Sequence, residues 1–197
     1  MSHSINPAKK SLGQHFLHDG KVLTKIVKTA KVTETDHILE IGPGKGHLTK
    51  KLLLQGCSVT AIELDHDLII GPLKDIAVNP KLEIVEGDAR KVNLKKLIAN
   101  TPYFKLVANL PYNAGTNILR SILLSDLPPQ LSVVMLQKEV ALNITAFPGK
   151  SNILSNLFQV YYDTNFHFNV QPTSFTPQPK VMSGVISLAK KKYTLTA

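Results

Sequence analysis

A short apolar strand that runs directly into three glycines is the feature that most constrains how this chain can fold. Residues 37–49 read His-Ile-Leu-Glu-Ile-Gly-Pro-Gly-Lys-Gly-His-Leu-Thr, and a helical pattern follows. Gly42, Gly44 and Gly46 let the backbone approach a ligand closely at the carboxyl end of a strand, the usual crevice of a doubly wound sheet. The G-x-G-x-G spacing is neither the G-x-G-x-x-G of nicotinamide enzymes nor the Gly-Lys-Ser/Thr of a P-loop. Glu40, just before the turn, would repel a diphosphate and suits a cationic ligand.

Acidic or amide side chains stand where the next three strands end. The second strand ends in Glu63 and Asp65, and Glu63 follows Gly42 by about the 20 residues at which a carboxylate meets ribose hydroxyls. Glu63 is therefore the predicted ribose ligand, with a solvated strand end as the alternative interpretation. Asp65 is interpreted as a solvated strand end. Asp88 follows the third strand, where it could accept from an adenine amino group, and Asn109 ends the fourth. Carboxyl ends of parallel strands share one sheet edge, so we expect these groups to line a single nucleotide-type site.

The tetrapeptide Asn109-Leu110-Pro111-Tyr112 places an amide next to an aromatic ring after an apolar run. A nucleobase amine is a poor nucleophile because its lone pair is delocalised into the ring. A catalyst must hold that amine by acceptors and clamp the base by stacking. Asn109 offers the acceptor and Tyr112 offers the face. A strand that ends in a proline turn beside a half-buried tyrosine is the alternative interpretation, and the upstream strand ends favour the first.

Strands and helices alternate along the chain, which predicts an α/β fold with a doubly wound, mostly parallel sheet. Helices are expected near 20–31, 46–55, 67–77, 115–124 and 139–145, and strands near 37–42, 58–65, 82–87, 103–109, 131–136, 158–168 and 184–189. The last two strands flank a proline-rich loop, which favours an antiparallel edge. Residues 1–18 are mostly polar and contain Gly13. We expect them to lie outside the core as a flap over the ligand site, and residues 19–197 to form one domain.

Composition favours a polyanionic partner. The 197 residues carry a formal net charge of +9 with a pI near 9.6, and lysines cluster in the first 35 residues and at 190–192. Cys57 is alone, so no disulfide can form within the chain. No apolar run approaches the ~18 residues of a membrane span, and His15 and His18 lack the partners of a zinc site. We therefore expect a cytoplasmic monomer with no membrane association and no metal.

Six segments together resemble the ribosomal RNA adenine N6-dimethyltransferase family of the kasugamycin-resistance type, and the resemblance covers nearly the whole sequence. They are residues 9–19 (Lys-Lys-Ser-Leu-Gly-Gln-His-Phe-Leu-His-Asp), 40–46, 63–65, 87–89, 109–112 and 175–181 (Phe-Thr-Pro-Gln-Pro-Lys-Val). The first and last are the specific ones. The resemblance implies a Rossmann-like class I methyltransferase fold, with residues 19–197 as the catalytic domain that binds S-adenosylmethionine. It further implies N6,N6-dimethylation of adjacent adenosines in small-subunit (16S) rRNA during ribosome biogenesis, with this rRNA or a pre-small-subunit particle as partner.

The resemblance also assigns site residues. Implied cofactor contacts are His15, where many relatives carry asparagine, and Leu17, Gly42, Gly44, Glu63, Leu64, Asp88, Ala89 and Asn109. Implied catalytic residues, which grip the adenine, are Asn109, Leu110, Tyr112 and Phe175. In the expected mechanism the Asn109 side-chain oxygen and the Leu110 carbonyl accept the two amine hydrogens, Tyr112 stacks on the base, and no general base is needed in the transition state.

Other classes stay open at this point. The erythromycin-resistance methyltransferases resemble the chain in the same motifs but modify large-subunit rRNA, and some mitochondrial transcription factors are relatives that bind RNA or DNA without turnover. DNA adenine and protein glutamine methyltransferases more typically show Asn-Pro-Pro-Tyr. Residues 9–19 and 175–181 favour the small-subunit enzyme, and intact Glu63, Asp88 and Asn109 favour activity. Family members usually continue into a small helical domain that contributes to rRNA binding, which is expected to be absent here because the sequence stops sixteen residues after Val181.

Overall fold

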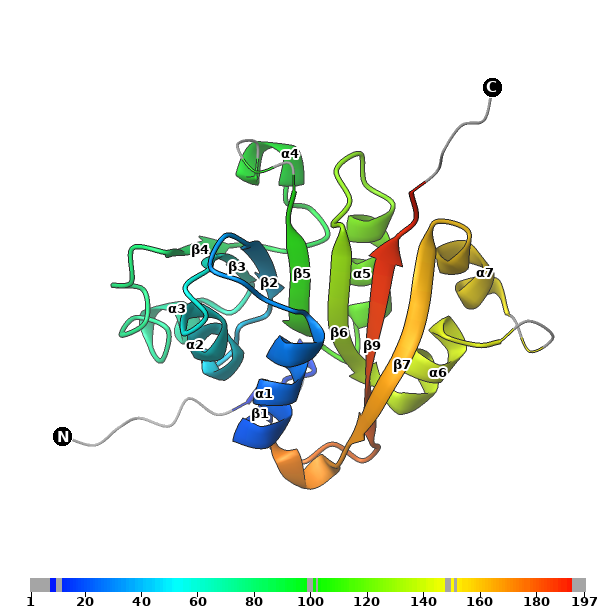
Figure 1. Ribbon diagram of the computed structural model, residues 1–197. Helices are drawn as coiled ribbons and strands as arrows, with labels where there is room; N and C mark the ends of the chain where they lie inside the picture. The colour runs from blue at the N-terminus through cyan, green and yellow to red at the C-terminus, as the bar shows by residue number, and fades with distance from the viewer. Residues whose placement is uncertain are drawn as a thin grey trace.

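The computed structural model describes residues 8–9, 12–98, 101, 103–147, 150 and 152–192. Within these residues seven strands form one sheet in the order β4-β3-β2-β5-β6-β9-β7 (Figure 1). The strands are β2 (His37–Ile41), β3 (Ser58–Glu63), β4 (Leu82–Glu86), β5 (Lys105–Asn109), β6 (Leu131–Gln137), β7 (Tyr162–Val170) and β9 (Ser183–Lys190). The strands from β4 to β6 pair in parallel, and β9 pairs antiparallel with both β6 and β7. The predicted α/β fold with a mostly parallel sheet and an antiparallel edge is confirmed.

Helices cover both faces of this sheet and define two main cores. The helices are α1 (Gly20–Thr29), α2 (His47–Leu53), α3 (His66–Ile70), α4 (Leu94–Leu97), α5 (Gly115–Leu123), α6 (Lys138–Ile144) and α7 (Ile153–Gln159). Side chains alternate between the faces along a strand, so neighbouring residues enter different cores. Leu106 packs with α5, α6 and α7, whereas Val107 packs with α1 and α2. This burial on both faces explains why the central strands are almost wholly apolar.

Local sequence explains where α1 begins and which face it buries. The carboxylate of Asp19 accepts hydrogen bonds from the backbone N–H groups of Lys21 and Val22 and so caps the helix N-terminus. Leu23, Ile26 and Val27 follow at helical spacing and are all buried. Their burial against the sheet holds α1 beside the N-terminal segment that precedes it (Figure 1).

A second, two-stranded sheet joins the beginning of the described chain to its late loop. Strand β1 (Phe16–Leu17) pairs antiparallel with β8 (Phe175–Thr176), which follows the short 3-10 helix η2 (Pro172–Ser174). Phe16 and Leu17 are 7% and 5% exposed. The expectation that residues 1–18 lie outside the core is therefore wrong for these two, because β-pairing with β8 carries their apolar side chains into the interior. Residues 1–7, 10 and 11 of the predicted flap lie outside the described residues.

Several elements and boundaries differ from the predicted ones. The strand expected at 158–168 begins at Tyr162, because α7 extends to Gln159 after a capping box formed by Asn152 and Ser155. The helix expected at 67–77 ends at Ile70, and turns follow it. Helix α7 and the one-turn helix α4 were not predicted. The four residues of α4 are too few to show a helical period.

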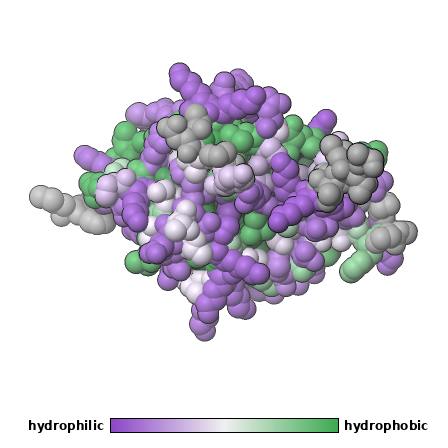
Figure 2. Space-filling view, turned by 45° about the horizontal axis from the view of Figure 1, so that its top comes forward, coloured by the Kyte–Doolittle hydropathy of each residue, from purple (hydrophilic) through white to green (hydrophobic). Residues whose placement is uncertain are grey.

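Hydrophilic side chains cover most of the face shown in Figure 2, and hydrophobic ones form smaller patches between them. Among the described residues no helix combines the length and apolar character needed to cross a membrane.

Candidate active site

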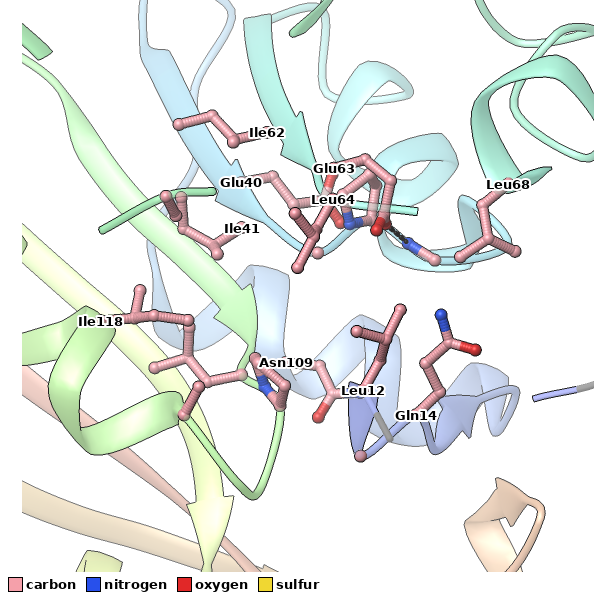
Figure 3. A pocket seen from close by; sticks show the side chains of 18 of the residues that line it. Leu12, Gln14, Glu40, Ile41, Ile62, Glu63, Leu64, Leu68, Asn109 and Ile118 are labelled. Atoms are coloured by element: carbon pink, nitrogen blue, oxygen red, sulfur yellow. Dashed lines mark hydrogen bonds between the residues drawn. The ribbon is translucent and has the colours of Figure 1, made fainter. Parts of the chain in front are cut away.

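A cavity of about 320 Å³ opens at the sheet edge where β2, β3, β4 and β5 end. Its walls are the residues that follow these strands, together with residues 12–17 of the N-terminal segment. Figure 3 shows Glu63 and Leu64 on one side, across from Leu12, Gln14 and Asn109. The strand ends identified in the sequence therefore converge on one cavity, whose size is typical of a small-molecule site.

The glycine turn after β2 needs a backbone that other residues rarely adopt. Gly44 has a φ of +60°, and a Cβ there would lie 3.0 Å from the ring of Phe16. Gly46 has a φ of +76°, and its Cβ would lie 2.2 Å from Cδ1 of Ile76. Both positions combine left-handed backbone with lack of space, so glycine is required at each. The turn brings its main chain against the cavity, as the spacing predicted.

Glu63 is held by the backbone around it. One carboxylate oxygen accepts from the N–H of Gly44 at 3.1 Å, and the other accepts from the N–H of Asp65 at 2.9 Å. Burial raises the pKa of Glu63, and these backbone hydrogen bonds oppose the rise. Each carboxylate oxygen can accept more than one hydrogen bond, so acceptor capacity remains for a ligand hydroxyl. The ribose contact proposed for Glu63 stays a prediction.

Asp88 forms an ion pair with Arg90 that no sequence motif indicated. Its two oxygens lie 2.9 and 3.1 Å from Nε of Arg90, and Nη2 of Arg90 lies 2.6 Å from Oδ2. These bonds to Arg90 lower the pKa of Asp88 to about 2. Asp88 therefore faces the cavity as an ionised acceptor, and Arg90 fixes its orientation.

Glu40 is the most deeply buried acid of the site. The side chain is 1% exposed, and its Oε2 has no hydrogen-bond partner among the described residues. Burial raises the pKa of Glu40 to about 8, and the charge of Glu63 adds to the rise. A positively charged ligand in the cavity would stabilise the ionised carboxylate, in keeping with the cationic ligand that the sequence favoured.

Asn109 lines the cavity and has a buried acceptor atom without a partner among the residues that the structure describes. Its Nδ2 donates to the main-chain oxygen of His15 at 3.2 Å, which orients the amide, and its buried Oδ1 has no partner in the described part of the chain. Such an unpaired polar atom is costly unless a ligand satisfies it. Tyr112 stands beside it, with its hydroxyl 2.5 Å from Oγ of Ser183. Burial raises the pKa of Tyr112, so the ring is a neutral face at physiological pH.

Hydrogen bonds and an ion pair hold the N-terminal segment at both ends of the cavity. Asp65 pairs with Nζ of Lys9 at 2.6 Å and with Nε2 of Gln14 at 2.7 Å, while the main-chain oxygen of Leu17 contacts Nδ1 of His47 at 2.8 Å. Asp65 is 4% exposed, so its interpretation as a solvated strand end is wrong. Burial alone would raise the pKa of Asp65, but the bonds from Lys9 and Gln14 lower it. Gln14 belongs to the motif at 9–19, which was the available signal for this role.

All of the predicted site residues except Phe175 line the cavity. The lining residues among them are His15, Leu17, Gly42, Gly44, Glu63, Leu64, Asp88, Ala89, Asn109, Leu110 and Tyr112. Phe175 does not: its ring is 1% exposed and packs in the core with Leu17, its β-partner. The predicted contact of Phe175 with the base does not fit this geometry, because the ring would have to leave the core. In the described part of the chain, no group of three or more His, Cys, Asp or Glu side chains is placed to hold a metal ion.

In the sheet, β9 lies between β6 and β7 and is antiparallel to both. This sheet order and the glycine-lined cavity define a Rossmann-like methyltransferase fold. A dimethyladenosine transferase from Plasmodium falciparum superposes with a TM-score of 0.78 at 31% identity, over 90% of this chain and 64% of that one. The 23S rRNA methyltransferase ErmE superposes with a TM-score of 0.81 at 26% identity, over 92% of this chain and 72% of that one.

Sequence relatives narrow the class to one family. The family model described as ribosomal RNA adenine dimethylase matches residues 5–196, and the chain belongs to this family. Ribosomal RNA small subunit methyltransferase A of Geobacter sulfurreducens is 42% identical over 91% of this chain, and that of Ligilactobacillus salivarius is 43% identical over 93%. The chain spans 66% and 64% of these two relatives. The family resemblance stated from the motifs is thereby confirmed.

Proposed function

We propose that this chain transfers methyl groups from S-adenosylmethionine to the N6 nitrogen of adjacent adenosines in small-subunit rRNA, two to each adenosine, during assembly of the subunit. The observation that carries this proposal is the buried, unpaired Oδ1 of Asn109 in a cavity that also holds the face of Tyr112. A planar base with an exocyclic amine satisfies both groups at once, since it donates hydrogen bonds at its edge and stacks through its face.

The cavity fits S-adenosylmethionine on two grounds. Its acidic groups, Glu40, Glu63 and Asp88, suit a ligand that carries positive charge, and the buried Oε2 of Glu40 lacks a partner that such a ligand would supply. Glu63 would accept from the ribose hydroxyls and Asp88 from the adenine amino group of the cofactor. When bound, the cofactor supplies a methyl group on a positively charged sulfur, which makes the carbon electrophilic.

The chain itself has to position the amine and stabilise the charge that develops on nitrogen. Asn109 Oδ1 would accept one amine hydrogen and the Leu110 carbonyl the other, which draws the lone pair out of conjugation with the ring. The bond from Asn109 Nδ2 to His15 already fixes the orientation of the amide, so little reorganisation is needed. Tyr112 would hold the base by stacking. The methylated nitrogen is strongly acidic and loses its proton to water, so no general base is assigned.

Two observations bear on the choice of RNA. The net charge of +9 suits a polyanion, and relatives about 42% identical are named small subunit methyltransferases. The close superposition on ErmE keeps large-subunit rRNA as the second candidate. Over about nine tenths of the chain, the sequence identity is 42% to the small-subunit relatives and 26% to ErmE. This difference favours small-subunit rRNA as the substrate.

Transfer of a labelled methyl group decides between these substrates. The protein and labelled cofactor are incubated in parallel with four substrates: free small-subunit rRNA, assembling small-subunit particles, mature small subunits and large-subunit rRNA. The position of the label in each RNA is then mapped. We expect N6,N6-dimethyladenosine at adjacent positions of small-subunit rRNA. Label confined to large-subunit rRNA would transfer the proposal to the second candidate, and no label in any RNA would refute it.

Asn109→Ala tests the residue that carries the proposal. Turnover should fall by about 10²–10³-fold, the loss typical of one preorganised polar contact, while RNA affinity changes little. The matched control is Asn117→Ala, which removes an exposed amide on α5. Normal turnover in the Asn109 variant, with weakened RNA binding, would remove this residue from the chemistry.

A further inference from the structure

His15 touches three parts of the site that are distant in sequence. Its main-chain oxygen accepts from Asn109 Nδ2 at 3.2 Å, and its Nδ1 lies 2.8 Å from the main-chain oxygen of Pro177. Its imidazole ring packs at an angle of 34° against the ring of Tyr112, with 5.1 Å between centroids. The side chain is thus directed to the base-binding residues and to the loop after β8.

The preceding residue is directed to the opposite end of the cavity. Gln14 donates to Asp65, whose backbone N–H in turn holds Glu63, the proposed ribose ligand. Figure 3 shows Gln14 reaching toward the side on which Glu63 lies. Two adjacent residues therefore serve different ends of one site, and each can be altered while the other keeps its contacts.

Two contacts from separate elements hold the Tyr112 ring. Ser183 at the start of β9 binds the hydroxyl, and His15 packs on the ring itself. The carbonyl of Pro177 can only accept, so Nδ1 of His15 carries a hydrogen and the hydrogen bond fixes the plane of the imidazole. The plane of Tyr112 is consequently set from the N-terminal segment.

We propose that the imidazole of His15 is a positioning residue, which acts through Tyr112 and sets the plane on which the target adenine stacks. The inference rests on the proposed function and deepens it. It differs from the cofactor contact implied for His15 by the family resemblance, because it assigns the side chain to the base. Without the imidazole the tyrosine pivots about its bond to Ser183, and fewer bound bases present the amine to Asn109.

The first test observes Tyr112 directly and needs no activity. The chain contains five tyrosines, so a carbon-13 spectrum of tyrosine-labelled protein holds few signals, and Tyr112→Phe identifies the one that disappears. We expect His15→Ala to shift the Tyr112 signal and leave the other tyrosine signals in place. Gln14→Ala is the matched control, since it loosens the same segment at the Asp65 end. An unshifted Tyr112 signal in His15→Ala, or an equal shift in both variants, would overturn the proposal.

The second test uses kinetics with rRNA and S-adenosylmethionine. His15→Ala should lower kcat about 2- to 10-fold, the range that the energy of one aromatic pair represents, with little change in cofactor affinity measured by calorimetry. His15→Phe restores a ring against Tyr112 but not the bond to Pro177, whereas His15→Asn retains a donor without a ring. We expect phenylalanine to recover more of kcat than asparagine. Recovery by asparagine alone would assign the effect to the Pro177 bond and refute the proposal.

The two tests distinguish failure of the proposed methyltransferase function from failure of the positioning role of His15. If the wild-type chain methylates no rRNA, the proposed function fails, and the tyrosine spectrum still decides whether His15 positions Tyr112. If the wild type is active and the His15 and Gln14 variants lose kcat equally, the proposed function stands and the positioning role fails.

Discussion

Replacing Glu40 with glutamine should make the protein more stable, and increasingly so as pH rises. Burial raises the pKa of Glu40 from 4.5 to about 8. The folded state therefore binds more protons than the unfolded state between these two values, and the free energy of unfolding falls as pH rises through them. At 1.36 kcal/mol per pKa unit, the full loss above pH 8 is about 5 kcal/mol. Domains are stable by only about 5–15 kcal/mol, so the effect is large.

Urea denaturation of the wild type and Glu40→Gln measures this effect. Between about pH 5.5 and about pH 8.5 the gap between the two proteins should grow by about 3 kcal/mol in favour of the variant. Glutamine has nearly the same shape but no charge, so the variant isolates the ionisation. Glu139→Gln, an exposed position on α6, is the control and should give a gap that does not change with pH. A constant gap for Glu40→Gln would refute the buried, ionisable state of this carboxyl.

Substitutions at three further positions, Glu63, Tyr112 and Gly46, test other parts of the site. Glu63→Ala should weaken S-adenosylmethionine binding by about 1.5–3 kcal/mol in calorimetric titration, through loss of charge-assisted bonds to the ribose, and unchanged affinity would exclude that contact. Tyr112→Phe keeps the ring face and should retain most activity, whereas Tyr112→Ala should lose ~1–3 kcal/mol of stacking, seen as weaker rRNA binding; equal effects would argue against stacking. Gly46→Ala should lower the free energy of unfolding by about 1–3 kcal/mol, because its Cβ would meet Ile76 at 2.2 Å, whereas at Gly20 a Cβ meets nothing within 4 Å and alanine should cost little.

The part of the site at the sheet edge could be predicted from sequence because its geometry is local. A parallel strand ends at the same edge as its neighbours, so a residue at the end of a strand or just after it is placed by the strand alone. Gly42, Glu63, Asp88 and Asn109 follow this rule, and all four line the cavity. Burial of the central strands on both faces made those strands recognisable as apolar runs.

Contacts between distant segments could not be predicted in this way. Nothing in the sequence near Phe175 shows that its ring enters the core beside Leu17, because the pairing of β1 with β8 decides it. The same holds for Asp65, whose burial depends on Lys9 and Gln14 more than 50 positions earlier. The strand expected from residue 158 shows a different limit: Phe158 belongs to α7, and a short apolar run does not distinguish the end of a helix from the start of a strand.

The pairing of β1 with β8 also determines when the cavity can be completed during synthesis. The contact between His15 and Pro177 joins residues that lie 162 positions apart in the sequence. The N-terminal segment that contacts Asn109 and Tyr112 therefore completes its contacts only when a very long loop has closed. On a ribosome, which releases the chain from its N-terminus, the strands around the glycine turn are available long before residue 177 emerges. The sheet edge and the contacts of the N-terminal segment with His47 and Asp65 can form early, whereas β1 lacks its partner strand until residues 175–176 emerge. A nascent chain that ends before β8 would contain every acidic residue of the cavity and still lack the β-pairing that closes it.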